Sequence, residues 1–412
     1  ASLETHAVIK HGSAITAARF YPGGDYLVTS SSDKSAILWD YRIPLPQKTS
    51  LFAHDEAVGD CFFGSAGKQL VTIHGNSASN WMLEDPSAPL LSMQHGAVIT
   101  DAHVGTEGKL LVTSSADRTA AVWEIASGKQ ILRLADHDTS VRDAHMSANG
   151  KWVVTAAGTP GDTHSSTVEV WNGKSGERIR PATIVPGLVH SVRFLPAIPA
   201  SSLPARILTL TGSLANQPGA ARLWDLNTGE PIGLSMQHGD AINFVDISED
   251  GLALLTSSRD TTARLWSTVD GSPLTPPLLH PASVLSCDIR PDGLFLVTAC
   301  KDGTTHIWDR RTGNPISQGP LHNAPVRVIT FGPAGTQVLS ADESGIARFW
   351  HLRSKITDPQ TAQQIAQLLS GHHVSSTSQL LPSPPADILN KWRALQPVIS
   401  RKLKVTTTEQ FH

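Results

Sequence analysis

Eight of the ten tryptophans recur at nearly constant intervals along the 412-residue chain, and this recurrence limits the possible folds more than any other feature. Successive members are separated by 42, 42, 48, 53, 42, 42 and 42 residues. The series consists of Trp39, Trp81, Trp123, Trp171, Trp224, Trp266, Trp308 and Trp350. Because a period of about 40–45 residues is typical of a propeller blade with four strands, the sequence predicts an all-β ring with one blade per repeat.

A histidine precedes seven of these tryptophans, by 27 or 28 residues in six repeats and by 34 in the fourth. Four residues after each histidine, an apolar residue opens a segment such as Ile242–Ile247, which predicts a first strand. Turn pairs such as Asp250-Gly251 then predict a hairpin into a second strand. The seven histidines are His11, His54, His95, His137, His238, His280 and His322.

These repeats resemble those of the WD-repeat β-propeller family, in which a histidine precedes the first strand, an aspartate lies in the turn before the third, and Trp-Asp ends it. The dipeptide is complete at Trp39-Asp40, Trp224-Asp225 and Trp308-Asp309. The turn aspartate stands six residues before the tryptophan in four repeats, as Asp33, Asp117, Asp260 and Asp302. The resemblance covers residues 5–353 and implies an eight-bladed propeller of four-stranded antiparallel blades. It leaves the function open, because one fold hosts many functions.

The recurrence also predicts a structural role for the repeat residues. A catalytic histidine is needed once, whereas this histidine returns seven times at a fixed distance from a tryptophan. We therefore expect each imidazole to link a turn to the Trp-bearing strand by hydrogen bonds, which satisfy polar groups that the blade must bury.

The two ends of the repeat region complement each other. Residues 4–10 have the pattern of a fourth strand without three strands before it, and the chain around Trp350 supplies three strands without a fourth. Pairing the two would close the ring and remove two exposed sheet edges. The sequence thus predicts an eight-bladed propeller over residues 1–354, with a seven-bladed ring containing one broken repeat as the alternative.

Residues 355–412 are expected to form a C-terminal extension with two short helices and a frayed tail. Asp358 and Gly371 suit the two ends of the first helix, and Ser383 suits the start of the second. Two short amphipathic helices cannot bury their apolar stripes against each other alone, so we expect them to dock on the propeller or on a partner.

Composition and motifs argue against several classes of function. With 33 Lys and Arg against 36 Asp and Glu, the chain has a net charge of −3 and no basic block, which opposes nucleic-acid binding. No apolar run reaches the ~18 residues of a membrane span, and no signal peptide is visible, so a cytoplasmic location is expected. Neither a phosphate-binding loop nor a nucleophile elbow is present. Neither His372-His373 nor the loop with Asp162 and His164 supplies three spaced ligands, so we expect no metal, no cofactor and no catalysis.

The three cysteines have a structural explanation. Cys61 and Cys287 occupy a first-strand position that other repeats fill with alanine, valine or isoleucine, which predicts a buried slot. Cys300 lies in the next strand of the same repeat as Cys287 and could approach it. A free pair is favoured over a bridge in the cytosol.

The repeat is relaxed in two neighbouring blades, in the turn between the second and third strands. Repeat four has six extra residues around 158–165, and repeat five lengthens the same turn around 212–219 and also its first hairpin at 197–204. Function concentrates on loops carried by rigid scaffolds, which makes the two turns candidate partner-binding loops, whereas tolerated drift in loop length is the alternative. The candidate contact residues are Pro160, Asp162, His164, Leu214, Asn216 and Gln217.

The sequence therefore predicts a non-enzymatic platform for protein–protein interaction, built on a monomeric propeller. Similarity to bacterial WD-repeat blocks at the C-terminal end of signalling proteins, such as serine/threonine kinase-like chains, implies a scaffold or sensor module of a larger protein. The alternative is a propeller enzyme or a small-ligand binder that uses the central channel. Unpaired charged residues at the inner ends of the first strands would favour that alternative, and a nucleic-acid binder ranks third.

Overall fold

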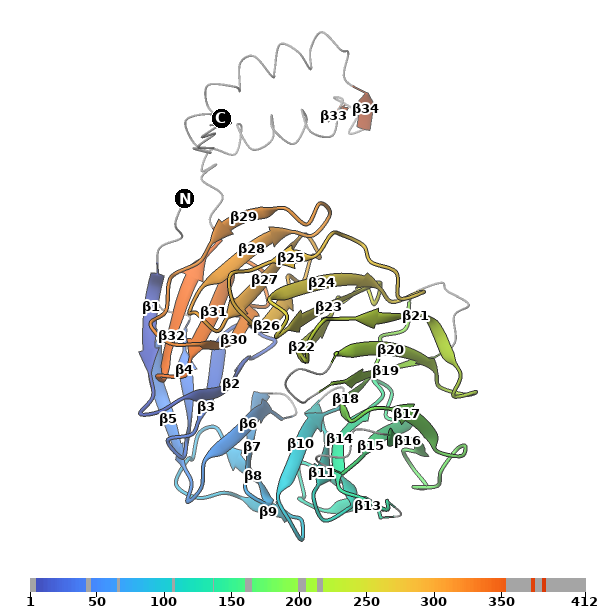
Figure 1. Cartoon of the computed structure of the whole chain (residues 1–412). Helices are drawn as coiled ribbons and strands as arrows, with labels where there is room; N and C mark the ends of the chain where they lie inside the picture. Colours follow the sequence, from blue (N-terminus) through green and yellow to red (C-terminus); the bar gives the residue numbers. More distant parts are fainter. Residues whose placement is uncertain are drawn as a thin grey trace. The chain divides into compact units, whose positions relative to one another are not determined.

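Eight four-stranded antiparallel sheets surround one axis in the computed structural model of the chain (Figure 1). The structure describes residues 5–41, 46–64, 67–105, 108–135, 137–159, 165–198, 205–212, 218–352, 372–374 and 380–382. By its contacts the chain divides into two compact units, Ser2–His351 and a second one made of Leu352–His412 with Ala1. The prediction of an eight-bladed propeller is confirmed, and the seven-bladed alternative is wrong.

The strands of every blade follow one another outward from the axis. The first strands are β2 (Ile15–Phe20), β6 (Val58–Phe63), β10 (Ile99–Val104), β14 (Val141–Met146), β18 (Val189–Phe194), β22 (Ile242–Ile247), β26 (Val284–Ile289) and β30 (Val326–Phe331). The second strands are β3 (Tyr26–Ser31), β7 (Gln69–His74), β11 (Leu110–Ser115), β15 (Trp152–Ala157), β19 (Arg206–Thr211), β23 (Ala253–Ser258), β27 (Phe295–Cys300) and β31 (Gln337–Asp342). The third strands are β4 (Ser35–Asp40), β8 (Ser77–Met82), β12 (Ala120–Glu124), β16 (Ser165–Asn172), β20 (Ala220–Asp225), β24 (Thr262–Ser267), β28 (Thr305–Asp309) and β32 (Ile346–His351). The fourth strands are β5 (Gln47–Ala53), β9 (Leu91–Gln94), β13 (Gln130–Leu134), β17 (Thr183–Pro186), β21 (Pro231–Gln237), β25 (Leu278–Leu279), β29 (Pro315–Gln318) and β1 (Thr5–Lys10).

The character of each strand follows from its distance from the axis. The second strands are packed between neighbouring blades on both faces, and β27, with the sequence FLVTAC, is buried at every position after its first. Such a strand reads as an unbroken run of apolar and β-branched residues. The fourth strands lie at the rim, and β5 exposes most of its residues.

The hydrophobic core consists of apolar clusters between neighbouring blades. One cluster joins Leu255 and Leu265 of one blade to Cys287, Cys300 and Trp308 of the next. All three cysteines of the chain are free and buried, and the pattern of the first strands predicts this burial for Cys61 and Cys287. Burial raises the pKa of the Cys61 and Cys300 thiols to about 12, so both behave as small apolar side chains.

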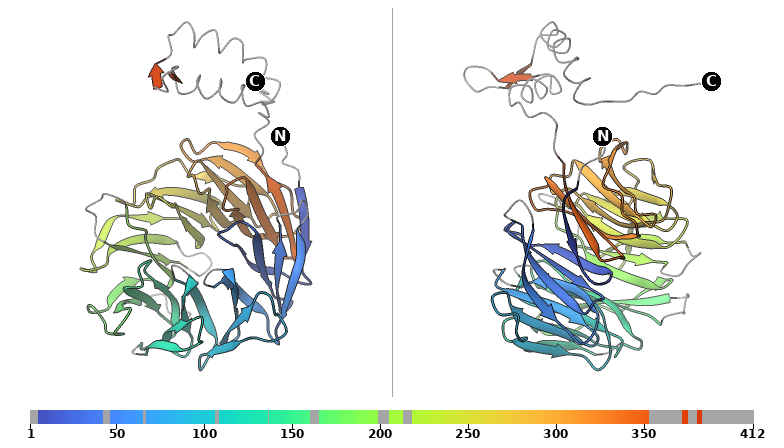
Figure 2. Two further views of the ribbon diagram at one scale, coloured as in Figure 1. Left: turned by 180° about the vertical axis from the view of Figure 1, so that it is seen from behind. Right: turned by 90° about the vertical axis from the view of Figure 1, so that its left-hand side faces the viewer.

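The ring is closed by its N-terminal strand. β1 pairs antiparallel with β32, with Ile9 opposite Ala347 and Lys10 opposite Ile346. Ile9 is buried in a cluster that also contains Trp39 of the first blade. β1, in blue, and β32, in orange, lie side by side in every view of the propeller (Figures 1 and 2). The predicted pairing of residues 4–10 with the last repeat is thus confirmed.

The described part of the second unit is a single short hairpin. β33 (His372–Val374) pairs antiparallel with β34 (Leu380–Pro382). The two predicted helices and the predicted tail lie outside the described residues. Within the described ranges, the chain has no helix long and apolar enough to cross a membrane.

Candidate functional site

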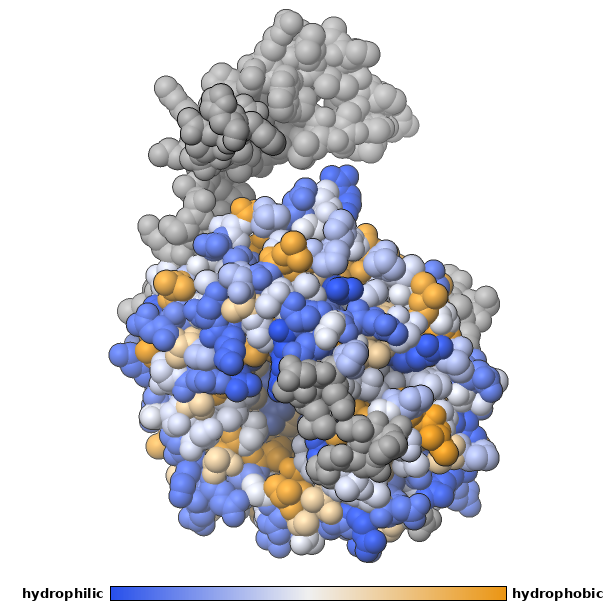
Figure 3. Space-filling view, in the orientation of Figure 1, coloured by the Kyte–Doolittle hydropathy of each residue, from blue (hydrophilic) through white to orange (hydrophobic). Residues whose placement is uncertain are grey.

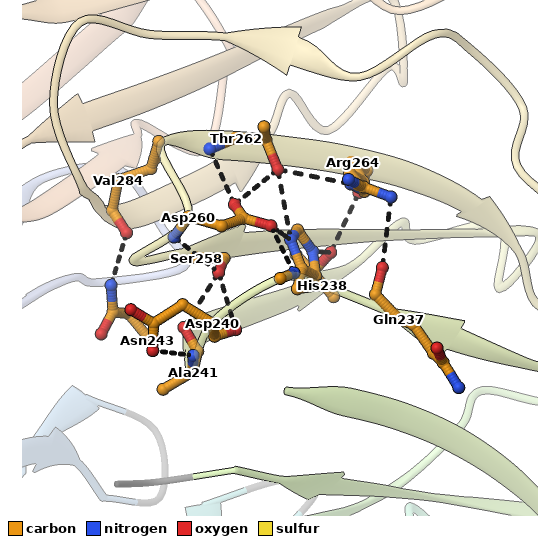
Figure 4. Close-up of polar contacts among 12 residues, drawn as sticks. Gln237, His238, Asp240, Ala241, Asn243, Ser258, Asp260, Thr262, Arg264 and Val284 are labelled. Atoms are coloured by element: carbon orange, nitrogen blue, oxygen red, sulfur yellow. Dashed lines mark hydrogen bonds and ion pairs between the residues drawn. The ribbon is translucent and has the colours of Figure 1, made fainter. Parts of the chain in front are cut away.

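The repeat histidine of the sixth blade belongs to a polar network between two turns (Figure 4). His238 Nδ1 lies 2.9 Å from Asp260 Oδ2, and the same oxygen accepts a hydrogen bond from the backbone N–H of Gly239 at 2.9 Å. The Thr262 hydroxyl donates to Asp260 Oδ1 at 2.7 Å. Burial alone would raise the pKa of Asp260, but the hydrogen bonds from His238 and Thr262 lower it, so this carboxylate is ionised at neutral pH.

The network continues from the histidine to the repeat tryptophan. His238 Nε2 lies 2.7 Å from the Thr256 hydroxyl, which also accepts the Trp266 indole N–H at 2.9 Å. An ionised Asp260 can only accept, so His238 carries a proton on Nδ1. One chain of donors and acceptors thus joins the turn before the first strand to the third strand.

The same chain of contacts recurs, with variations, around the ring. It is complete at His11 with Asp33 and at His95 with Asp117, where the distances from Nδ1 to Oδ2 are 3.1 and 3.3 Å. The acid of the last blade is Asp342, 2.8 Å from His322. Spacing alone missed Asp342, because it stands eight and not six residues before its tryptophan.

Other repeats depart from this arrangement, and the seventh and second blades are two examples. In the seventh blade, His280 Nδ1 has no hydrogen-bond partner among the described residues, so Asp302 does not complete the network there. In the second blade, the His54 ring packs on His74 with 4.6 Å between centroids. Burial lowers the pKa of both His54 and His280 to about 4, which keeps both rings neutral at physiological pH.

A hydroxyl partner for every repeat tryptophan is the feature that sequence reasoning missed. All eight indole N–H groups donate to a second-strand hydroxyl at 2.8–3.2 Å. The acceptors are Thr29, Thr72, Thr113, Thr155, Thr209, Thr256, Thr298 and Ser340. The signal was present, since a threonine recurs at the centre of nearly every second strand, as in LVTSS and LVTAC.

Polar side chains of the first strands fasten neighbouring blades to each other around the axis. The hydroxyls of Thr16 and Thr100 each donate to a carbonyl of the next first strand at 2.6 Å, and the Asn243 amide does so at 2.7 Å. Further along these strands, Asp246 and Asp288 each accept a backbone N–H from the next blade, at 2.8 and 2.6 Å. Some charged residues that face the axis, Asp246 and Asp288 among them, therefore already bind neighbouring blades of the ring.

Asp246 and Asp288 form a carboxyl pair between the sixth and seventh blades. Burial raises the pKa of Asp288 well above its usual range, and the neighbouring Asp246 raises it further. Asp288 therefore holds a proton at neutral pH and donates it in a hydrogen bond to Asp246. Because the folded protein binds the proton of Asp288 more tightly than the unfolded chain does, the free energy of unfolding falls as pH rises above the unfolded pKa of about 4.

We expect Asp288→Asn to be at least as stable as the parent at pH 8, because the amide can donate to Asp246 and accept the Phe331 N–H. Asp288→Ala should reduce the free energy of unfolding by about 1–3 kcal/mol, because it leaves the Phe331 N–H without an acceptor. Urea unfolding at pH 5 and pH 8 measures both effects, and the advantage of the asparagine variant over the parent should grow with pH. A large loss of stability in Asp288→Asn at pH 8 would show that Asp288 is ionised.

Blades three to five bring a second set of charged groups to the axis. Arg193 Nη1 lies 3.8 Å from one carboxylate oxygen of Asp101 and 3.8 Å from one of Asp143. Burial would raise the pKa of Asp143, but Arg193 lowers it, whereas burial and the charge of Asp143 raise the pKa of Asp101 well above its usual range. One ionised carboxylate, one protonated carboxyl and one guanidinium result.

Comparison with known proteins agrees with the geometry of the blades. The family model for the WD domain, G-beta repeat, matches residues 3–40, 88–124, 128–172, 229–267 and 276–309. These matches fall in five separate repeats, in a chain whose strands form eight four-stranded blades. The chain contains WD repeats in an eight-bladed β-propeller.

The relatives of this WD-repeat propeller share only part of their length with it. It is 23% identical to the autophagy-related protein 16 of Arabidopsis thaliana over 57% of the chain and 43% of that protein. It is 25% identical to the WD repeat-containing protein 37 of Pongo abelii over 29% of the chain and 24% of that protein. The chain therefore corresponds to less than half of either relative. The crystal structure of the computationally designed Ika8 protein superimposes with a TM-score of 0.69 at 20% identity, covering 84% of this chain and 99% of that one, which shows the fold.

The candidate partner-binding loops of the propeller lie outside the described residues. Pro160, Asp162 and His164 fall between β15 and β16, and Leu214, Asn216 and Gln217 fall between β19 and β20. The described ends of both loops contact turns that lead into first strands, since Gly158 N donates to Ser140 O and Gly219 N donates to Asp240 O. Blades four and five are neighbours in the ring, because β14 packs against β18.

Metal binding has no support in the described part of the propeller. Among those residues, no three His, Cys, Asp or Glu side chains are placed to hold a metal ion. The loop residues Asp162 and His164 lie outside that part, and only the backbone of His372-His373 is described. The repeat histidines His11, His322 and His54 contact a hydroxyl, a carboxylate and an aromatic ring, respectively.

Proposed function

We propose that this WD-repeat propeller is a non-enzymatic platform for protein–protein interaction and that it binds its partner through the loops between second and third strands of blades four and five. The observation that carries the proposal is the local relaxation of an otherwise regular repeat. Six blades keep the repeat spacing within one residue, and two neighbours lengthen the same turn. Function concentrates on such loops when the scaffold beneath them is rigid.

The scaffold beneath these loops supports a fixed recognition surface. Each loop leaves a second strand whose threonine binds the repeat tryptophan, Thr155 in blade four and Thr209 in blade five. On the face seen in Figure 3, hydrophilic residues predominate and hydrophobic residues lie in small groups, which favours recognition by local features over a broad apolar patch.

Trimming both loops to the length of the other blades is expected to abolish partner capture while leaving the melting temperature unchanged, because no strand or core position is altered. The measurement is quantitative capture from lysate of the source cells with the immobilised protein. The matched control shortens the 197–204 loop, which joins first and second strands and therefore leaves the blade at its other end. Capture of the same proteins in the same amounts by the trimmed and parent proteins would refute the proposal.

The location of the propeller and the kind of protein that contains it are also proposed here. We propose that the propeller is a cytoplasmic scaffold or sensor module of a larger bacterial signalling protein. The partial coverage of both curated relatives supports a modular role, since the aligned part makes up 43% of one relative and 24% of the other. The net charge of −3 favours a protein over a nucleic acid as partner. We further propose that the propeller itself is monomeric and needs no cofactor.

A further inference from the structure

A cavity of about 290 Å³ lies beside the axis of the ring, where the first strands of blades three to six face one another. Its wall is polar on four strands and includes Asp101 of β10, Arg142 of β14, His190 and Arg193 of β18, and Asn243 of β22. Phe244 of β22, 44% exposed, adds an aromatic surface. β14 packs closely against β18 and β22 against β26, whereas β18 and β22 contact each other less, which leaves room for the cavity.

Several side chains in this wall have buried polar atoms without a hydrogen-bond partner among the described residues, and Arg142 and His190 are two of them. Arg142 Nε is buried and makes no hydrogen bond with a described residue, and Arg142 forms no ion pair in the described part of the chain. Neither ring nitrogen of His190 has a hydrogen-bond partner of good geometry among the described residues. A buried guanidinium nitrogen and a buried imidazole without partners are costly unless a ligand or water satisfies them.

The charges around the cavity leave one cation uncompensated. Arg193 is neutralised by Asp143, and burial together with that negative charge keeps a proton on Asp101. Burial also lowers the pKa of His190 to about 4, so its neutral ring retains one N–H donor at physiological pH. Arg142 is then the remaining charge in the wall, and it is positive.

We propose that this cavity binds a small oxyanion, a carboxylate or a phosphate group of a small molecule, between Arg142 and His190. The Arg142 guanidinium supplies the charge and a planar set of donors that suits either group. His190 adds a neutral donor from the neighbouring strand β18. The proposal goes beyond the interaction platform, because it needs neither the long loops nor a protein partner.

The blade that closes the ring provides a matched control. Arg327 occupies in β30 the position that Arg142 occupies in β14, the second residue of the first strand. Its guanidinium is already paired, since Arg327 Nε lies 2.5 Å from Glu343 Oε1. Removing Arg327 therefore changes the net charge as Arg142→Gln does, without removing an unpaired cation from the cavity.

Isothermal titration calorimetry of the full chain tests the proposal with sodium phosphate in one arm and sodium acetate in the other, at constant ionic strength and pH 7. The parent should bind at least one anion saturably with a Kd of about 1 mM, and the arm that binds identifies the oxyanion. Arg142→Gln should weaken this binding about tenfold or more, and His190→Asn several-fold, with unchanged melting temperatures. Arg327→Gln should bind like the parent.

Three results would overturn this assignment. The first is the absence of saturable binding of either anion by the parent up to about 50 mM, well above the expected Kd. The second is parental affinity in both Arg142→Gln and His190→Asn. The third is an equal loss of affinity in Arg327→Gln, which would show that binding follows net charge and not this cavity.

Discussion

Deletion of residues 1–10 lowers the melting temperature by about 10 °C or more, or leaves the protein aggregated, if the ring is closed as the structure shows. The deletion removes all of β1, and it exposes the hydrogen-bonding edge of β32 from Ile346 to Trp350. It also removes Ala7 and Ile9 from a cluster shared with Trp39, and a buried isoleucine alone is worth about 2–5 kcal/mol. An unpaired edge is in addition a template for association with other chains.

Calorimetry and light scattering measure the two consequences of this deletion. Deletion of residues 1–4 is the matched control, because it leaves Thr5–Lys10 in place. The shorter deletion should melt like the parent and remain monomeric. If both deletions gave the same melting temperature, β1 would not be closing the ring in solution.

Thr256→Val has the second large effect, a loss of about 2–4 kcal/mol in the free energy of unfolding. Valine has nearly the same shape as threonine but offers no hydroxyl. The change leaves two buried groups without their partner, the Trp266 indole N–H and His238 Nε2. Urea unfolding monitored by tryptophan fluorescence measures the loss.

The second blade provides the control for this prediction. Thr72 accepts the Trp81 indole N–H at 2.9 Å, but His54 Nε2 has no hydrogen-bond partner among the described residues. Thr72→Val thus removes one link of the network, where Thr256→Val removes two. We expect its cost to be smaller by about 1 kcal/mol, the usual contribution of one hydrogen bond. Equal losses in the two variants would mean that the histidine contributes nothing through the threonine.

The architecture of the propeller was predictable because each blade repeats the same solution. Eight tryptophans at intervals of 42 to 53 residues indicated the number of blades, and a lone strand pattern at residues 4–10 indicated how the ring closes. The contacts of individual residues were harder to predict. Asp302 stands at the expected spacing yet leaves His280 Nδ1 unsatisfied, whereas Asp342 stands at another spacing and binds His322. Moving the aspartate by two residues within the turn decides whether it contacts the histidine. Counting residues between the aspartate and the tryptophan does not predict that contact.

The groups at the axis were not predictable from the repeat. Arg193 contacts Asp101 and Asp143, which belong to two other blades, about 90 and 50 residues earlier in the chain. Their meeting depends on how the first strands face one another across the ring, and periodicity carries no information about that. The same geometry leaves Arg142 without a counter-charge among the described residues, although the sequence places it in the same strand position as the paired Arg327.

Site-specific photocrosslinking tests the central claim most directly, namely that a protein partner binds the loop-bearing end of blades four and five. A photoreactive amino acid is placed at Asp162 or Asn216, in the two long turns, and at Ala200, in the hairpin that leaves blade five at its other end. Each protein is then irradiated in lysate of the source cells. The account predicts one common crosslinked partner from positions 162 and 216 and none from position 200. A partner crosslinked from position 200 alone would contradict it.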